Sequence, residues 1–533
     1  MPTEPASHAD TIPGLAAVAA RRWPHRPAII DGDRILTFSD LDKERRRAGR
    51  ALIALGIEHG DRVGIWAPNI WEWIVAAVAI QSAGAIVVPV NTRMKGQEAA
   101  DILSDAGARA LFVIGDFLGA HYPDLISAVW PKTLEQMIVL RDARAGETDW
   151  ESFLALADEV SEAELAARMP DAEDISDILF TSGTTGRAKG VMTAHGQNIR
   201  AFDAWANAVG LVEGDRYLVV SPFFHSFGYK AGWVAALMRG ATVYPVQAFD
   251  AELALAQIER DRITVMPGAP TLYHSLLAHP RLKDFDISSL RAAITGSATI
   301  PPILIERMRS ELGFDVVLSG YGLTESCGVV SLSVASDDPE TVATACGRAI
   351  EGIELRCVDE KGNPVPTGTP GEVVVRGYNV MRGYFNSPQA TRDTVDADGW
   401  LHTGDVGLLD ERGYLRITDR MKDMFIVGGF NCYPAEVERL LSAHPAIGQV
   451  AVIGVPDDRL GEVGKAFVVP KPGATINGAE IIAWAREHMA NYKVPRLVDI
   501  VTALPTNASG KVVKPELRKM SVPAARTADP VTR

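Results

Sequence analysis

Residues 181–190 read Thr-Ser-Gly-Thr-Thr-Gly-Arg-Ala-Lys-Gly and directly follow the apolar run Ile178–Phe180. Glycines and hydroxyl residues after a strand supply backbone N–H groups and short side-chain donors that suit a polyphosphate. Lys189 adds a cation to the same segment. The segment therefore predicts a phosphate-binding loop rather than an ordinary solvated turn.

Two common phosphate-binding loops are excluded by spacing. A Walker A loop requires Ser or Thr after its lysine, whereas Gly190 follows Lys189. The dinucleotide fingerprint is also missing, because Gly320-Tyr-Gly322 is followed by Glu325 where the third glycine belongs.

On both sides of this loop, short β-branched runs alternate with Ala- and Leu-rich segments of helical pattern, such as Leu41–Leu55 and Glu252–Arg260. The predicted strands are Arg62–Trp66, Ala85–Val90, Ala110–Ile114, Tyr217–Ser221, Thr242–Val246 and Val316–Ser319. This alternation predicts an α/β fold with largely parallel sheets.

The pattern changes after Asp359. A stretch rich in proline and glycine precedes short strands at Glu372–Arg376 and Gly413–Ile417, which predict a β-rich region. From Ala435 the order helix, strand, strand, helix predicts a small α+β domain (Ala435–Ala443, Gln449–Val455, Ala466–Val469, Gly478–Met489). We therefore expect a large domain over 1–421, a small one over 422–520 and a disordered tail over 521–533.

Composition narrows the class of protein. The 533 residues carry a net charge of −14, which disfavours a nonspecific nucleic-acid or anionic-membrane binder. Four scattered cysteines fit core thiols in a reducing compartment better than a disulfide framework.

Met1–Asp10 has no apolar segment, and Trp71–Val90 is interrupted by polar residues, glycine and proline. The second stretch predicts a buried helix and strand rather than a membrane span, and the expected location is the cytoplasm.

Five motifs in a fixed order resemble the adenylate-forming (ANL) superfamily of acyl-CoA synthetases, peptide-synthetase adenylation domains and firefly-type luciferases. They are Thr181–Gly190, Tyr321-Gly-Leu-Thr-Glu325, Thr403-Gly-Asp405, Asp419-Arg-Met-Lys-Asp423 and Pro505-Thr-Asn-Ala-Ser-Gly-Lys511. The resemblance runs from about Leu15 to Met520. It implies layered α/β sheets with a β-rich subdomain, followed by a small mobile α+β C-terminal domain.

The resemblance also implies a reaction in two halves. A carboxylate attacks the α-phosphate of Mg²⁺-bound ATP to give acyl-AMP, and the thiol of coenzyme A then takes the acyl group. Because the two reacting anions repel each other, catalysis must consist mainly of charge neutralisation and positioning. Lys511 would bridge the carboxylate and the α-phosphate, while Glu325 and Thr184 would hold Mg²⁺.

The remaining nucleotide contacts follow residue by residue from the motifs. Asp405 and Arg420 would bind the ribose, Tyr321 would stack on adenine, and Ser297 and Ala298 would line the adenine pocket. The full ATP-binding set is Thr181, Ser182, Gly183, Thr184, Thr185, Gly186, Lys189, Ser297, Ala298, Gly320, Tyr321, Gly322, Thr324, Asp405, Arg420 and Lys511.

Two further segments resemble moving or thiol-binding parts of the family. Lys422 falls at the hinge about which the small domain rotates between the two half-reactions. Gly428, Gly429 and Phe430 resemble the loop that opens the pantetheine passage, where glycine leaves the passage open. An ordinary hairpin turn is the alternative for this loop.

Pro222–Lys230 resembles the aromatic and histidine-bearing segment before the family's acyl-pocket helix. His225 would order the carboxylate or close the tunnel, Tyr229 would act as a gate, and Trp233 would line the pocket. Lys230 is unusual beside an apolar pocket, because a buried unpaired ammonium is costly. It must either extend to solvent or meet a polar group of the substrate, such as a ring ketone.

At this level the chain is most similar to the actinobacterial acyl-CoA synthetases of steroid-ring breakdown, which activate a bicyclic indane propanoate. The stretches that carry this similarity are 222–232, 263–277, 342–348 and 419–438. The expected partners are a small carboxylic acid, ATP and coenzyme A, without nucleic acid. The resemblance suggests a homodimer.

Two alternatives remain open from the sequence. The same fold could activate plain medium- or long-chain fatty acids, or it could load a carrier protein in place of free coenzyme A. Reversible acetylation of Lys511 would remove the catalytic charge.

Overall fold

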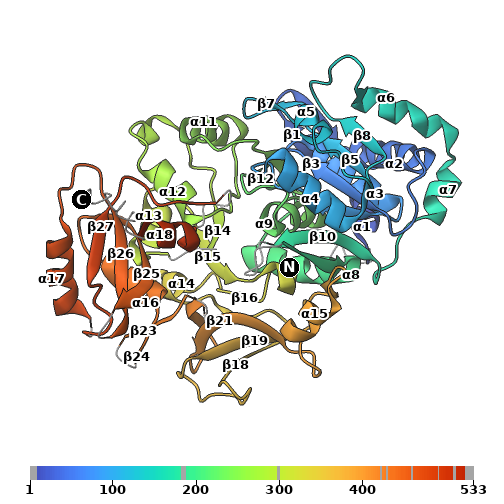
Figure 1. Cartoon of the computed structure of the whole chain (residues 1–533). Coiled ribbons are helices and arrows are strands. Elements are labelled where there is room, and N and C mark those ends of the chain that lie inside the picture. The colour runs from blue at the N-terminus through green and yellow to red at the C-terminus, as the bar shows by residue number, and fades with distance from the viewer. Residues whose placement is uncertain are drawn as a thin grey trace, which may run out of the picture. The chain divides into compact units, whose positions relative to one another are not determined.

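The computed structural model describes residues 9–181, 188–296, 300–420, 423–427, 430–457, 460–489, 491–507 and 512–521. The chain forms two compact units (Figure 1). The first contains Met1–Gly296, Ile303–Arg356 and Val374–Thr403, and the second contains Ser297–Pro302, Cys357–Val373 and Gly404–Arg533. The boundary predicted at residue 422 stays a prediction.

The largest sheet of the first unit has eight strands. In spatial order they are β20 (Gly383–Tyr384), β11 (Lys189–Ala194), β10 (Ile175–Thr181), β4 (Ile86–Pro89), β3 (Arg62–Trp66), β5 (Ala108–Val113), β8 (Gln136–Val139) and β9 (Thr148–Asp149). From β10 to β9 every pairing is parallel, whereas β11 is antiparallel to both of its neighbours. The parallel α/β sheet predicted from the alternating pattern is confirmed.

Helix α3 (Trp71–Ser82) explains the apolar stretch that precedes β4. Every residue from Glu72 to Ser82 is buried, as expected for a helix that is hydrophobic on all sides. The predicted buried helix and strand are therefore confirmed. Among the described residues, no helix combines the length and the hydropathy that crossing a bilayer requires.

Two further four-stranded groups complete the sheets of this unit. One is β12 (Arg216–Val219), β13 (Thr242–Pro245), β1 (Pro27–Asp31) and β2 (Arg34–Thr37), and the other is β14 (Ala292–Gly296), β15 (Val316–Tyr321), β16 (Ser331–Leu332) and β17 (Arg348–Ala349). Val265 bridges Tyr217 and Ala292, so that the two groups are continuous. A small hairpin is formed by β6 (Asp116–Phe117) and β7 (Ala120–His121).

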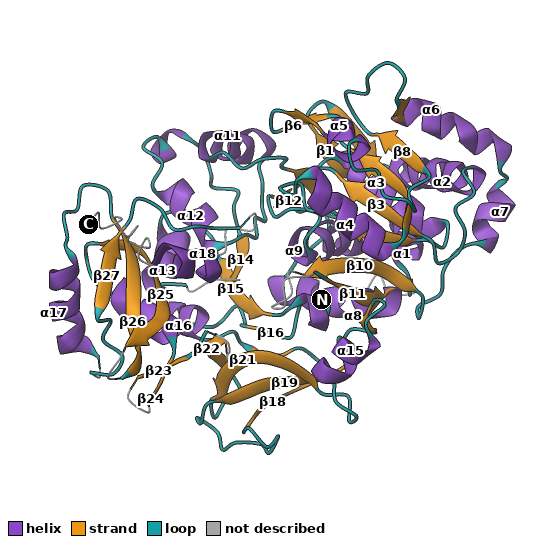
Figure 2. Ribbon diagram, in the orientation of Figure 1, coloured by secondary structure: helices purple, strands orange, loops and turns teal. Residues whose placement is uncertain are grey.

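Helices surround these sheets in Figure 2. They are α1 (Ile12–Arg22), α2 (Phe38–Ala54), α4 (Gly96–Ala106), α5 (Tyr122–Ser127), α6 (Trp150–Ala155), α7 (Glu162–Ala167), α8 (His195–Val209), α9 (Ser226–Gly228), α10 (Ala235–Arg239), α11 (Ala251–Asp261), α12 (Pro270–Leu277), α13 (Pro302–Ser310), α14 (Pro339–Thr344) and α15 (Pro388–Thr394). Short turns of other helical types are η1 (Leu156–Glu159), η2 (Tyr229–Val234), η3 (Leu282–Asp284) and η4 (Thr324–Ser326). Helix α2 begins with a capping box in which Thr37 and Asp40 satisfy each other's backbone N–H groups.

A four-stranded sheet is built from β18 (Ile353–Val358), β19 (Gly371–Gly377), β21 (Leu401–Leu409) and β22 (Leu415–Arg420). A sheet of the second unit contains, in spatial order, β24 (Phe430–Cys432), β23 (Phe425–Val427), β26 (Gly461–Pro470) and β25 (Ile447–Asp457), and β27 (Leu497–Ile500) pairs with β26. The helices of this unit are α16 (Pro434–Ser442), α17 (Gly478–His488) and α18 (Lys514–Ser521). Val437, Val452 and Ile481 share one buried core, so the predicted α+β arrangement is observed.

Candidate active site

The predicted phosphate loop joins two strands whose ends are held together. Thr181 closes β10, Lys189 opens β11, and the two residues are antiparallel partners. Oγ1 of Thr181 donates to the carbonyl oxygen of Lys189 at 3.4 Å. Ser182, Gly183, Thr184, Thr185 and Gly186 lie outside the described residues, but the strands fix where their loop begins and ends.

Tyr384 of β20 connects this hairpin to Glu325. Its phenol donates to Oε1 of Glu325 at 2.9 Å, and the ammonium of Lys189 lies 4.9 Å from the centre of its ring. Burial, followed by the charge of Glu325, raises the pKa of Tyr384, so the phenol remains a donor at neutral pH. Tyr384 was not among the residues predicted from the sequence. The tyrosine in Gly383-Tyr-Phe385 was the available signal, because a buried phenol needs a polar partner.

Glu325 and Thr324 lie on the tight turn η4. Ser326 Oγ accepts from the backbone N–H of Leu323, and Cys327 takes a left-handed conformation with φ of 57°. The turn leaves Thr324 and Glu325 partly exposed. Cys327 is buried, and burial raises the pKa of its thiol to about 12.

The two segments predicted to contact adenine start from neighbouring strands. Gly296 at the end of β14 is the parallel partner of Gly320 in β15, and Tyr321 ends β15. A Cβ on Gly322 would lie 2.3 Å from the carbonyl oxygen of Gly328, which explains why this turn requires glycine. Ser297 and Ala298 follow Gly296 and lie outside the described residues.

The predicted ribose contacts belong to the second unit. Asp405 in β21 and Arg420 in β22 are antiparallel partners, so the sheet brings their backbones side by side. Asp405 is buried. Lys422, Gly428, Gly429 and Lys511 lie outside the described residues; Phe430, which opens β24, pairs with Val427.

The predicted acyl segment forms α9 and the π-helical turn η2. His225 caps α9, and its Nδ1 accepts from the backbone N–H of Phe227 at 3.2 Å. Tyr229 and Trp233 are fully buried and stack at 5.0 Å between ring centres, with Trp73 packed against both. The hydroxyl of Tyr229 accepts from Nε2 of Gln81 at 2.7 Å. Short π-helical turns often occur at functional sites.

The structure differs from both predictions made for Lys230, namely that it extends to solvent or meets a polar group of the substrate. Its side chain is fully buried and does not reach solvent, and its Nζ lies 3.0 Å from Oδ1 of Asp177, which is also fully buried. Its partner is therefore a carboxylate of the protein rather than a group of the substrate. Asp177 was not among the predicted residues, although a lone aspartate inside an apolar strand predicts a buried cationic partner.

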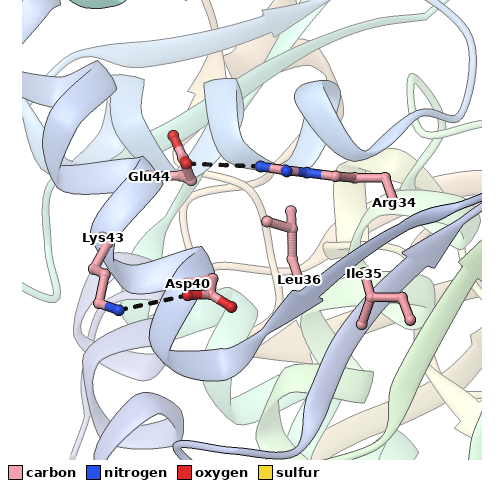
Figure 3. Close-up of a pocket in the computed structure, with 6 residues that line it drawn as sticks. All are labelled: Arg34, Ile35, Leu36, Asp40, Lys43 and Glu44. Atoms are coloured by element: carbon pink, nitrogen blue, oxygen red, sulfur yellow. Dashed lines mark hydrogen bonds and ion pairs between the residues drawn. The ribbon is translucent and has the colours of Figure 1, made fainter.

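Two open hollows of the first unit lie away from the predicted site residues. Figure 3 shows one of about 260 Å³, lined by Arg34, Ile35, Leu36, Asp40, Lys43 and Glu44. Its cations are paired, with Lys43 Nζ 3.5 Å from Asp40 and Arg34 3.8 Å from Glu44. A second hollow of about 360 Å³ lies beside Trp71 and Trp150. Neither hollow is lined by a residue predicted for the site.

A divalent cation fits the donor set at η4. Mg²⁺ in nucleotide sites takes one or two carboxylates together with substrate phosphates. Glu325 offers such a carboxylate on a partly exposed turn, next to the hairpin that carries the phosphate loop. Glu325, with Thr184 as predicted, would hold the ion there, and the ion would neutralise phosphate charge.

Comparisons with known proteins show the family to which the chain belongs. Residues 16–385 match the family model "AMP-binding enzyme", and residues 436–511 match "AMP-binding enzyme C-terminal domain". A 3-[(3aS,4S,7aS)-7a-methyl-1,5-dioxo-octahydro-1H-inden-4-yl]propanoyl:CoA ligase of Mycobacterium tuberculosis is 51% identical, and the alignment covers 96% of this chain and 99% of the relative. The ligase of the same name from Rhodococcus jostii is 48% identical over 96% and 98% of the two chains.

Solved structures share the fold. The anthranilate CoA ligase AuaEII in complex with anthranoyl-AMP superposes with a TM-score of 0.87 at 31% identity, over 96% of this chain and 97% of the other. ATP-bound MatB from Rhodopseudomonas palustris gives a TM-score of 0.84 at 31% identity, over 95% and 98% of the two chains.

Proposed function

The chain belongs to the AMP-binding enzyme family, and from this membership we propose that it is an ATP-dependent ligase joining a bicyclic, steroid-derived propanoate to coenzyme A. The acid is the methyl-dioxo-octahydroindenyl propanoate that the two actinobacterial relatives are named for. The observation that carries the proposal is 51% identity to the Mycobacterium tuberculosis ligase over 96% of this chain. The expected location remains the cytoplasm, and a homodimer remains the expected assembly.

In the first half-reaction the acid attacks the α-phosphate and forms acyl-AMP with release of pyrophosphate. Lys189, at the exit of the phosphate loop, adds positive charge beside the β- and γ-phosphates in a protein of net charge −14. Glu325, oriented by the phenol of Tyr384, would hold Mg²⁺ with Thr184, and the ion would neutralise phosphate charge. Lys511 neutralises the carboxylate and the α-phosphate as they meet.

The motifs assign the nucleoside contacts residue by residue. Tyr321, Ser297 and Ala298 bind adenine, and Asp405 accepts hydrogen bonds from the ribose hydroxyls with Arg420 on the neighbouring strand. The buried position of Asp405 supports this role, because a carboxylate removed from water gains more from a charge-assisted hydrogen bond.

In the second half-reaction the thiol of coenzyme A displaces AMP from the acyl group. The small domain, predicted over 422–520, would turn about Lys422, carry Lys511 away and present Gly428, Gly429 and Phe430 to pantetheine. Tyr229 and Trp233 keep their predicted roles as gate and lining of the acyl pocket; in the structure both side chains are fully buried and stacked on each other.

The deciding experiment measures AMP and thioester formation with Mg²⁺ and ATP, in the presence and absence of coenzyme A. The acids are the bicyclic diketo propanoate and saturated fatty acids of six to sixteen carbons. We expect thioester with the bicyclic acid only. Activity across the fatty-acid series would favour a plain fatty-acyl ligase, and AMP release indifferent to coenzyme A would favour transfer to a carrier protein.

A further inference from the structure

The buried ion pair between Lys230 and Asp177 joins two parts of the candidate site. Asp177 lies in β10, the strand that leads into the phosphate loop, and Lys230 lies in η2, directly after Tyr229 of the acyl segment. Both side chains have no exposed surface, and their charged atoms are 3.0 Å apart.

Hydroxyl and amide groups complete the pair. Thr193 in β11 accepts from Lys230 Nζ at 2.8 Å through Oγ1 and donates from the same atom to Asp177 Oδ1 at 2.9 Å. The other oxygen of Asp177 accepts from Ser176 Oγ at 2.7 Å and from Asn198 Nδ2 at 3.0 Å. The carboxylate is therefore fully engaged by the protein.

A gain in the stability of the fold is a weak explanation for a buried ion pair. Two charges removed from water lose hydration that their attraction restores only in part, and well-packed apolar residues often serve the fold equally well. A satisfied polar network does fix a unique geometry, because each member constrains the orientation of the others.

The segments joined by the network are those that must be aligned for acyl-AMP formation. Thr181 and Lys189 bound the phosphate loop on β10 and β11, the strands that carry Asp177 and Thr193. Strand β11 also pairs with β20, whose Tyr384 reaches Glu325. Lys230 ties the acyl segment to this same hairpin.

We propose that Lys230 and Asp177 form a positioning pair that sets the acyl segment at a fixed register against the phosphate hairpin, so that the carboxylate meets the α-phosphate. The inference rests on the proposed function. Lys230 acts through the hairpin and does not bind the ring ketones of the acid.

The test compares two reactions of purified full-length variants. Pyrophosphate exchange into ATP reports acyl-AMP formation, in which two separate substrates must be aligned. Thioester formation from synthetic acyl-AMP and coenzyme A does not need that alignment, because the acyl and phosphate groups are already joined. Thermal midpoints report folding.

The first variant is Lys230→Met with Asp177→Asn, which leaves no unpaired buried charge. We expect exchange to slow by about tenfold or more, since small displacements of reacting groups have large kinetic effects, while the reaction of supplied acyl-AMP changes by less than about threefold. The matched control is Arg45→Met with Asp42→Asn, a largely buried ion pair on α2. This control should alter the thermal midpoint without changing the rate of pyrophosphate exchange relative to the rate of thioester formation from supplied acyl-AMP.

A second pair of variants, each with one substitution at Thr193, tests the proposal if the double variant does not fold. Thr193→Val removes only the shared hydroxyl, and Thr193→Ser restores it. Slower exchange in Thr193→Val with recovery in Thr193→Ser supports the positioning pair.

Three outcomes are distinguishable. Wild-type protein without exchange for any acid would refute the proposed function itself. Active wild type with Thr193→Val and any folded double variant at wild-type rates would overturn the positioning pair alone. In the third outcome, the double variant loses exchange with acids that carry ring ketones but keeps it with the same bicyclic acid without them. This result would show that Lys230 contacts the substrate and would also overturn the positioning pair.

Discussion

The phenol of Tyr384 and the carboxylate of Glu325 are joined by a 2.9 Å hydrogen bond across 59 positions of sequence. The bond fixes one carboxylate oxygen of Glu325. Within η4, Glu325 is the only residue with a carboxylate that could bind a cation. The same ring lies 4.9 Å from the ammonium of Lys189, so one side chain orders a predicted metal ligand and a predicted phosphate contact.

Tyr384→Phe should weaken the use of Mg²⁺ and ATP while leaving the ring in place. A hydrogen bond to a charged group contributes about 1.5–3 kcal/mol, so we expect kcat/KM for ATP to fall about tenfold or more and the Mg²⁺ requirement to rise. Binding of Mn²⁺ with ATP, followed by electron paramagnetic resonance, gives a readout independent of turnover.

Tyr384→Leu removes the ring as well and should lower the affinity for ATP further. If Tyr384→Phe bound the metal nucleotide as tightly as the wild type, the phenol would have no part in orienting Glu325.

Asp405→Asn should weaken ribose recognition. Loss of the carboxylate from a buried acceptor site should raise the KM for ATP about tenfold or more. The specific signature is discrimination between ATP and 3′-deoxy-ATP, measured by pyrophosphate exchange. Wild type should prefer ATP strongly, and the variant should prefer it little. Equal preference in both proteins would remove Asp405 from the sugar site.

Lys511→Ala should separate the two half-reactions. Acyl-AMP formation should fall by about a hundredfold or more, because the charge that bridges two anions is lost, while thioester formation from supplied acyl-AMP should persist. Quantitative acetylation of Lys511 should have the same effect. Unchanged exchange after either modification would exclude Lys511 as the bridging cation.

Stability should fall in acid partly through His195, which lies at the start of α8. Its ring is buried, its Nδ1 accepts from the backbone N–H of Ile12 at 3.3 Å, and burial lowers its pKa to about 4. The unfolded chain binds this proton with a pKa of about 6.5, so between these values the unfolded state holds more protons. The contribution is complete above pH 6.5 and is lost as the pH falls towards 4, to a total of about 3 kcal/mol.

The comparison uses His195→Asn, whose Oδ1 can accept from Ile12 and does not titrate. Urea unfolding at pH 7 and pH 4 should show a loss of free energy of unfolding about 3 kcal/mol larger for wild type than for the variant. Parallel losses in the two proteins would mean that His195 is protonated in the folded state.

Much of the fold could be predicted because its strands are buried on both faces. Arg62–Trp66 reads as a continuous β-branched and aromatic run, and the observed strand has the same bounds. Most other ends moved by no more than three residues, whereas the strand predicted from Ala466 begins five residues earlier, at Gly461. The helix predicted as Leu41–Leu55 was observed as Phe38–Ala54, since the capping box at Thr37 sets its start.

Only part of the candidate site could be predicted from the sequence. Its motifs are local in sequence, so Thr181, Lys189, Glu325 and Asp405 could be named before any geometry was known. Tyr384 and Asp177 could not, because each acts through a partner that is distant in the chain and lacks a local pattern.

The sequence by itself determined the alternation of strands and helices, the order of the motifs and, through them, the family and its chemistry, since these depend on neighbouring residues and on spacing. Only the tertiary structure decided the role of Lys230. The free energy of a buried ammonium depends on what surrounds it in space, and the carboxylate of Asp177, 53 positions earlier in the chain, is the group that the fold brings to it.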